Sequence, residues 1–208
     1  MEIQKEQVST AVQHIDTIIA DIQQHIDKEQ DFVGFILVAL GVEFIGSFFD
    51  SKEFDEYGQS ENRFKNGMRL FKEDWYKTRL DWMFKEFRGP LIHQYRTGDK
   101  ILLTSYCKNK TSLKEHFVVK EGKTVFVLER LFEGFKEASD SFKNLARKQN
   151  SLDMKKVNQN YIGIRIITTT NSEQTHSYSV SGTTETPRDI KNLDLYTYQP
   201  SKKGRKKK

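Results

Sequence analysis

Apolar residues in the first fifty positions recur at the spacing of helices. Between residues 5 and 27 they return every three or four positions, which predicts an amphipathic helix. They are Val8, Val12, Ile15, Ile19, Ile22 and Ile26. Residues 32–48 are apolar on most sides, so we predict a second, central helix that Asp31 caps. An acidic connector over residues 50–59 follows this helix.

Two further helices are predicted before residue 90. Ser60 is placed to cap the first of them, and the second covers about residues 74–87. Pro90 has no backbone N–H and disfavours helical geometry at the residue before it. We therefore predict that this helix ends at about Arg88.

The pattern changes after residue 100. Short apolar runs at 101–103 and 117–119 have the length and composition of strands. Residues 120–123, Lys-Glu-Gly-Lys, form a hairpin-like connection to a third run at 124–128. A last amphipathic helix is predicted over 129–148.

Residues 149–208 differ in composition, being rich in Asn, Ser, Thr and Lys. Within them, only residues 161–167 have strand character. We therefore predict two parts: a helical domain over 1–148 and a less regular polar extension over 149–208. The predicted fold class is mainly α, a helical bundle with a small β-hairpin element.

Charge is concentrated at the C-terminal end of the sequence. The net charge is +5, but residues 201–208 carry six positive charges, and without them 28 basic residues face 29 acidic ones. The basic balance is therefore no argument that the folded body binds nucleic acid. The tail itself is either a solubilising end or a source of salt-sensitive RNA contacts. Its candidate residues are Lys202, Lys203, Arg205, Lys206, Lys207 and Lys208.

Cysteine usage and hydropathy point to the cytoplasm. The single cysteine, Cys107, cannot form an intrachain disulfide, which favours a reducing compartment. No signal peptide is evident. The apolar stretch at 32–49 contains Glu43, so we interpret it as a core helix rather than a membrane span. The histidines are scattered, so we expect no metal site. The sequence has no phosphate-binding glycine motif, so we expect no nucleotide cofactor.

The segment from Arg88 to Tyr95 carries the strongest chemical signal. Arginine holds phosphate oxygens in a fork of donors, and histidine exchanges protons near neutral pH. RNA supplies its own nucleophile, so Arg88 and His93 suffice for metal-free phosphodiester cleavage. One histidine cannot be base and acid at once. A symmetric dimer, with two such segments facing one groove, would supply both.

The spacing Arg88-x4-His93-x-Tyr95 resembles the signature of the HEPN superfamily. The resemblance covers about residues 5–148, an α-helical bundle with its motif after an amphipathic helix. It implies a dimeric, metal-independent endoribonuclease in which Arg88 and His93 are the catalytic pair. It also implies products ending in a 2′,3′-cyclic phosphate, in a toxin–antitoxin or antiviral defence setting.

The resemblance leaves two further points open. In some members the motif tyrosine is nucleotidylated by a nucleotidyltransferase antitoxin, so Tyr95 is either a regulatory or a packing residue. Active members commonly have a polar residue where this chain has Gly89. The alternative function is therefore a non-catalytic HEPN-like interaction or dimerisation module.

Two other groups of residues have alternative interpretations. Glu43 is either a structural helix residue or a buried partner of Arg88 or Arg63, since a buried carboxylate needs a partner. Trp75, Tyr76 and Trp82 form either part of the core or a stacking surface for single-stranded RNA. The cations near these aromatic residues are Lys72, Lys77, Arg79 and Lys85.

Overall fold

The structure is a computed structural model that describes residues 2–149 and 151–157. These residues are mainly helical, which confirms the predicted fold class. The predicted strand at 161–167 and the basic tail at 202–208 lie outside the described residues.

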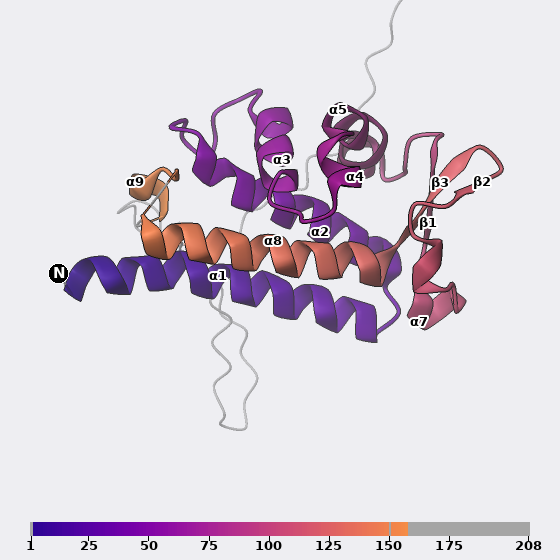
Figure 1. Cartoon of the computed structure of the whole chain (residues 1–208), viewed down its shortest axis with the longest axis horizontal. Coiled ribbons are helices and arrows are strands. Elements are labelled where there is room, and N and C mark those ends of the chain that lie inside the picture. The colour runs from indigo at the N-terminus through magenta and orange to yellow at the C-terminus, as the bar shows by residue number, and fades with distance from the viewer. Residues whose placement is uncertain (1, 150, 158–208) are drawn as a thin grey trace, which may run out of the picture. The chain divides into compact units, whose positions relative to one another are not determined.

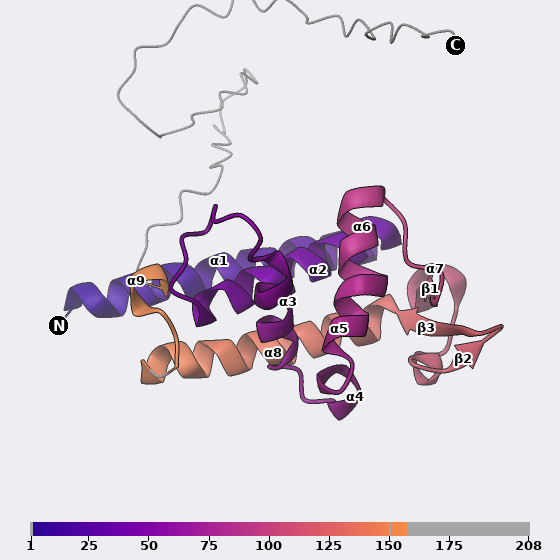
Figure 2. The same ribbon diagram turned by 90° about the horizontal axis from the view of Figure 1, so that it is seen from above.

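Three long helices form the body of the fold. They are α1 (Glu2–Asp27), α2 (Asp31–Gly46) and α8 (Leu128–Lys148). α1 and α8 run side by side in opposite directions, and α2 packs against both (Figures 1 and 2). The 3-10 helix Ser47–Phe49 continues α2, and the short helix α9 (Met154–Val157) packs on α1. The helical body therefore includes residues beyond 148.

A second group of helices covers α2. It comprises α3 (Ser60–Met68), α4 (Asp74–Lys77), α5 (Leu80–Trp82), a π-helix (Met83–Arg88) and α6 (Gly89–Gln94). α3 crosses α2 at close range because glycines meet there. A Cβ atom on Gly46 would lie 1.7 Å from the Arg63 carbonyl oxygen, and one on Gly67 would lie 2.0 Å from that of Val42. No larger residue fits at this crossing.

A three-stranded sheet closes one end of the bundle (Figure 1). Its order is β1 (Ile101–Thr104), β3 (Lys123–Val127), β2 (Val119–Lys120). β2 and β3 form the predicted hairpin, with Lys120 opposite Lys123. Glu121 and Gly122 have φ values of 50° and 74°, as a two-residue turn of the primed type requires. β1 pairs in parallel with β3, after a connection through α7 (Tyr106–Asn109) and the 3-10 helix Leu113–Glu115.

The segment Asp31–Phe49 is long and apolar enough to cross a membrane. In this fold it is the central helix, and 56% of that stretch is buried against the other elements. Its buried side chains include Phe35, Val38, Val42 and Ile45. This placement agrees with its interpretation as a core helix.

Two of the predicted helix caps are wrong. Gln30, not Asp31, precedes α2, and neither that cap nor the α3 cap is a side-chain hydrogen bond. The Asp31 carboxylate instead accepts a hydrogen bond from Ser105 Oγ at 2.5 Å. Ser60 lies within α3 and contacts Arg88. In both cases a partner distant in the sequence replaces the local bond that capping rules assume.

A buried ion cluster fixes the connector after α2. Arg63 is 5% exposed and donates from Nε to Asp50 Oδ2 at 3.0 Å. Its other nitrogens donate to the carbonyl oxygens of residues 52, 53 and 54. The Lys156 ammonium, 2.6 Å from Asp50 Oδ1, completes the cluster. Burial raises the pKa of Asp50, but the hydrogen bonds from Arg63 and Lys156 outweigh it, so this pKa is lowered overall.

A half-buried histidine, His116, joins the sheet to the helices. His116 Nδ1 accepts from the backbone N–H of Val127 at 2.9 Å, so the ring proton resides on Nε2. Nε2 lies 2.7 Å from the Tyr76 hydroxyl and donates to it. Burial, with a smaller contribution from the Arg130 charge, lowers the pKa of His116 from 6.5 to about 3. Burial also raises the pKa of Tyr76.

The His116 environment predicts that the protein loses stability in mild acid. The histidine is neutral in the fold but takes up a proton in the unfolded chain below about pH 6.5. The contribution of the neutral His116 to the free energy of unfolding is complete above pH 6.5 and falls as the pH drops towards 3. At pH 5 the loss is about 2 kcal/mol. Urea unfolding at pH 7 and pH 5 measures this loss, which the His116→Gln variant should lack. Parallel pH profiles for the two proteins would contradict it.

Candidate active site

The helix that carries the motif does not end at Arg88, so that prediction is wrong. Trp82, Arg88 and Gly89 all have helical dihedral angles, and the helical segment continues from Leu80 to Gln94. It accommodates the proline through a π-turn, in which the Gly89 N–H bonds to the Phe84 carbonyl five residues back. The motif therefore lies inside a helical segment and not at a helix start, where free backbone N–H groups could bind a phosphate.

The chain after α6 folds back onto this helix. Pro90 cannot donate to the Glu86 carbonyl four residues earlier. The backbone N–H of Gly98 donates to that carbonyl instead, at 2.7 Å. A Cβ atom on Gly89 would lie 3.1 Å from the Phe84 carbonyl oxygen, so the π-turn leaves little room for a side chain there. A larger residue would require the Phe84 carbonyl to shift by a few tenths of an ångström, so the contact favours glycine here.

Arg88 is buried and held by α2. It is 4% exposed, and Glu43 Oε2 accepts from its Nε at 2.7 Å and its Nη2 at 2.5 Å. Nη2 also lies 3.4 Å from Ser60 Oγ. Of the two partners that the sequence suggested for Glu43, the structure therefore selects Arg88. The two hydrogen bonds to Glu43 fix the orientation of the guanidinium. Removing either partner would leave a buried charge uncompensated, so the pair is expected to stay together.

The remaining terminal nitrogen of Arg88 points to His93. Nη1 lies 3.1 Å from His93 Nε2, and the imidazole is exposed. A guanidinium only donates hydrogen bonds, so Nε2 accepts and the neutral ring carries its proton on Nδ1. The two predicted catalytic residues are thus in direct contact, with the arginine beneath the surface and the histidine on it.

Tyr95 ends this helix in a left-handed conformation. Its φ is 56°, its N–H bonds to the Pro90 carbonyl, and its ring packs against Phe32 with 4.7 Å between centroids. The residue is nevertheless 70% exposed. The packing that we considered for Tyr95 is therefore one-sided, and the residue is accessible.

Ser60 is the site residue that sequence reasoning placed elsewhere. It lies one turn from the buried Arg63, and its hydroxyl faces the Arg88 guanidinium. The candidate RNA-binding residues from Lys202 to Lys208 lie outside the described residues. Within residues 2–149 and 151–157, no three potential metal-ligating side chains are grouped together.

Comparisons with protein-family models, curated proteins and solved structures find no match for this chain. The geometry of Arg88, His93 and their neighbours is therefore the basis for proposing a function.

Proposed function

We propose that this protein is a metal-independent endoribonuclease of a defence or toxin–antitoxin system, acting in the cytoplasm as a homodimer. The contact between Arg88 and the exposed His93 carries the proposal. It supplies a neutral imidazole, whose lone pair can accept a proton, beside a fixed cation that can stabilise a phosphate. Glu43 acts as a positioning residue through the arginine.

The proposed reaction uses the 2′-hydroxyl of RNA as nucleophile. A phosphate oxygen takes the Arg88 Nη1 donor, which releases His93 Nε2 to accept the 2′-hydroxyl proton. The 2′-oxygen bonds to phosphorus as the bond from phosphorus to the 5′-oxygen breaks. That oxygen receives a proton from the His93 of a second copy, which has first taken up a proton from solvent, and solvent then takes the proton that the first His93 gained. The products are a 2′,3′-cyclic phosphate and a 5′-hydroxyl, and no metal takes part.

The exposed Tyr95 supports a regulatory role within this proposal. A tyrosine that is 70% exposed, two residues after the histidine, is accessible to a nucleotidyltransferase antitoxin. A nucleotidyl group there would add bulk and negative charge beside the surface that binds RNA.

One observation favours a second candidate function. The Arg88 guanidinium is buried, and the described residues Glu43, Ser60 and His93 already occupy four of its five donor directions. That arrangement also suits a structural ion pair in a non-catalytic interaction or dimerisation module. Such a module would bind partners without cleaving RNA.

Incubation of the purified protein with RNA in the presence of EDTA distinguishes the two candidates. We expect cleavage with 2′,3′-cyclic phosphate ends, and no cleavage of the same sequence as DNA or as 2′-O-methyl RNA. Intact RNA at every protein concentration would overturn the ribonuclease proposal and favour the interaction module.

A further inference from the structure

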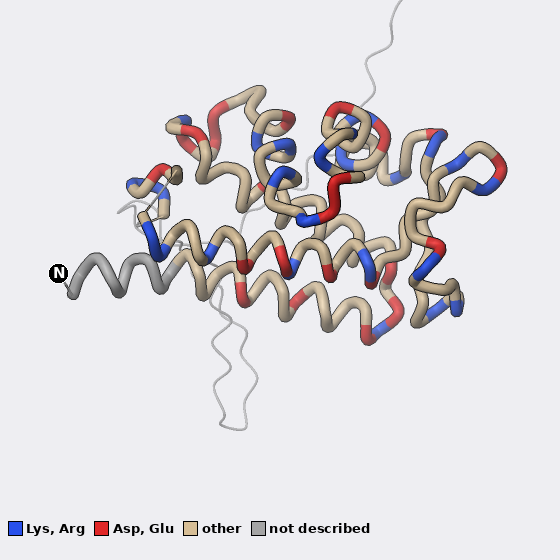
Figure 3. The backbone as a smooth tube through the Cα atoms, in the orientation of Figure 1, with Lys and Arg blue, Asp and Glu red and all other residues tan. Residues whose placement is uncertain are grey.

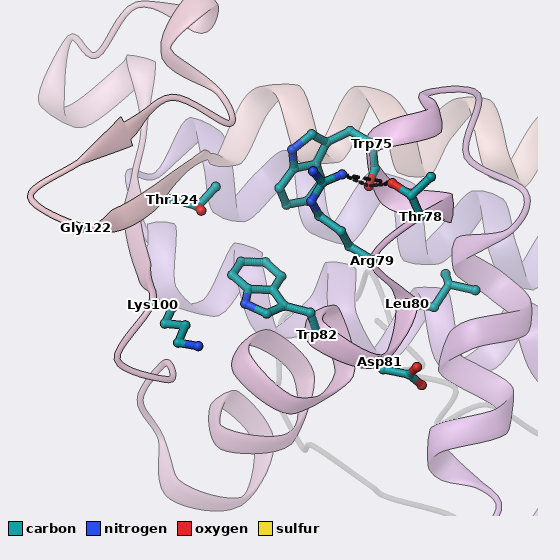
Figure 4. Close-up of a pocket in the computed structure, with 9 residues that line it drawn as sticks. All are labelled: Trp75, Thr78, Arg79, Leu80, Asp81, Trp82, Lys100, Gly122 and Thr124. Atoms are coloured by element: carbon teal, nitrogen blue, oxygen red, sulfur yellow. Dashed lines mark hydrogen bonds between the residues drawn. The ribbon is translucent and has the colours of Figure 1, made fainter.

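We call the helical segment Leu80–Gln94, which carries Arg88 and His93, the motif helix. A cavity of about 400 Å³ opens between residues 75–82, at the start of this helix, and the β-hairpin formed by β2 and β3. Both tryptophans of the chain, Trp75 and Trp82, line it, and their ring centroids lie 5.7 Å apart at nearly a right angle. Figure 4 shows the two indoles facing this space, with Lys100 beside Trp82. A space of this size accommodates one nucleotide.

Stacked planar groups form one wall of the cavity. The Trp75 indole lies on Phe117 with 4.0 Å between ring centroids and an angle of 12°. Arg79 covers the other side of the indole, with its guanidinium carbon 4.7 Å from the ring centroid. Figure 4 shows the arginine lying across the indole on the cavity side. The stack therefore ends in the exposed Arg79 guanidinium, a group that contacts RNA bases in many complexes.

Trp82 forms a second wall. Its indole is half-buried and is supported from behind by Phe126, with 6.2 Å between ring centroids and an angle of 24°. Tyr76, by contrast, is 1% exposed and belongs to the core. The aromatic group of the sequence thus divides, with one member inside the fold and the two tryptophans at the cavity.

The charges at the cavity favour an anionic ligand. Arg79 hydrogen-bonds only to the Trp75 carbonyl and the Thr78 hydroxyl among the described residues. Lys100 has no side-chain ion pair within that same part of the chain. Asp81, the carboxylate on the cavity rim, is paired with Lys65. Among the described residues, Arg79 and Lys100 are therefore two cations without carboxylate partners beside the indoles of the cavity.

We propose that this cavity binds one nucleotide of a single-stranded RNA, with its base stacked on Trp82, Arg79 at the edge of the base, and its phosphate near Lys100. The base provides the flat face and the phosphate the negative charge that the site lacks. Trp82 and Arg88 belong to one helical segment, about one and a half turns apart. The inference deepens the proposed function, because a base held here would orient a strand along the helix that carries the motif.

Intrinsic fluorescence tests the proposal directly, since Trp75 and Trp82 are the only tryptophans. The probe is a short 2′-O-methyl RNA oligonucleotide, which cannot be cleaved through its 2′-oxygen. We expect saturable quenching on titration into the full-length protein. Trp82→Leu keeps an apolar side chain but removes the stacking surface, so binding should weaken about tenfold to a hundredfold.

Two exposed variants keep the test independent of Trp82 packing. Arg79→Ala should lower the oligonucleotide affinity measured by quenching about tenfold, because the guanidinium contact is lost. Lys100→Ala should lower the slope of log affinity against log salt concentration by about 0.7, as expected for one lost phosphate contact. The matched control is Lys148→Ala, an exposed lysine on α8, which should change neither quantity.

Two results would overturn the inference. The first is binding of a labelled oligonucleotide, seen by anisotropy, without tryptophan quenching, since the strand would then bind elsewhere. The second is equally tight quenching by a nucleoside monophosphate, which would assign the cavity to free nucleotides. Because the probe is uncleavable, quenching without RNA cleavage refutes only the ribonuclease proposal. Cleavage without quenching refutes only this one.

Discussion

Replacing His93 with alanine is expected to lower the rate of RNA cleavage by about a hundredfold to ten-thousandfold, the usual contribution of a general acid–base group. In the proposed dimer the change removes both the base and the acid, which favours the upper end of that range. The imidazole is exposed, so the fold should remain intact. Single-turnover cleavage of a labelled RNA measures the rate, and thermal unfolding verifies the fold.

A second histidine provides the control for this prediction. His25 lies on α1, where its Nδ1 contacts Gln30, and among the described residues no hydrogen bond or ring contact joins it to residues 80–94. His25→Ala should therefore leave the cleavage rate unchanged. Equal rates for His93→Ala and the wild type would remove His93 from the reaction, even if the protein cleaves RNA.

Arg63→Met is expected to lower the free energy of unfolding by about 3–5 kcal/mol. The substitution keeps a long apolar stem but leaves the Asp50 carboxylate with one cation fewer and strips a donor from three backbone carbonyls. Total stabilities of about 5–15 kcal/mol are common, so this variant would lose a large share of its stability.

The exposed Arg69 at the end of α3 supplies the matched substitution. Its guanidinium contacts only the Asn66 side chain among the described residues, so Arg69→Met should change stability by less than about 0.5 kcal/mol. Urea unfolding of the two variants and the wild type compares the free energies. Similar losses in the free energy of unfolding for Arg63→Met and Arg69→Met would contradict a stabilising role of the buried ion cluster.

Local patterns predicted the long helices and the hairpin well. The apolar repeat placed α1, α2 and α8 to within a few residues, because burial of one face sets a helical period directly in the sequence. The hairpin followed from Glu121 and Gly122, which fit a turn with positive φ. The parallel pairing of β1 with β3 was not predicted, since the connection between them gives no local signal.

Local sequence patterns did not predict the geometry of the candidate site. The rule for proline assumes a regular α-helix, and it failed because a π-turn and the Gly98 N–H accommodate Pro90. Spacing alone suggested Arg88 and His93 as a pair, but in a regular helix neighbours are three or four residues apart, not five. Their contact, and the Glu43 carboxylate beneath it, depend on how α2 packs against the motif helix.

The π-turn at Met83–Arg88 has a consequence for recognising relatives of this chain. One helical turn there holds an additional residue, equivalent to a single insertion in an α-helix. Each residue of an α-helix advances the helix by about 100°, so the insertion rotates the face carrying Arg88 relative to the face carrying Trp82. In an alignment with a relative that has a regular helix here, the segments before and after the π-turn would therefore both match only if a one-residue gap is placed within 83–88. A pattern that fixes the distance from Trp82 to the motif would miss it.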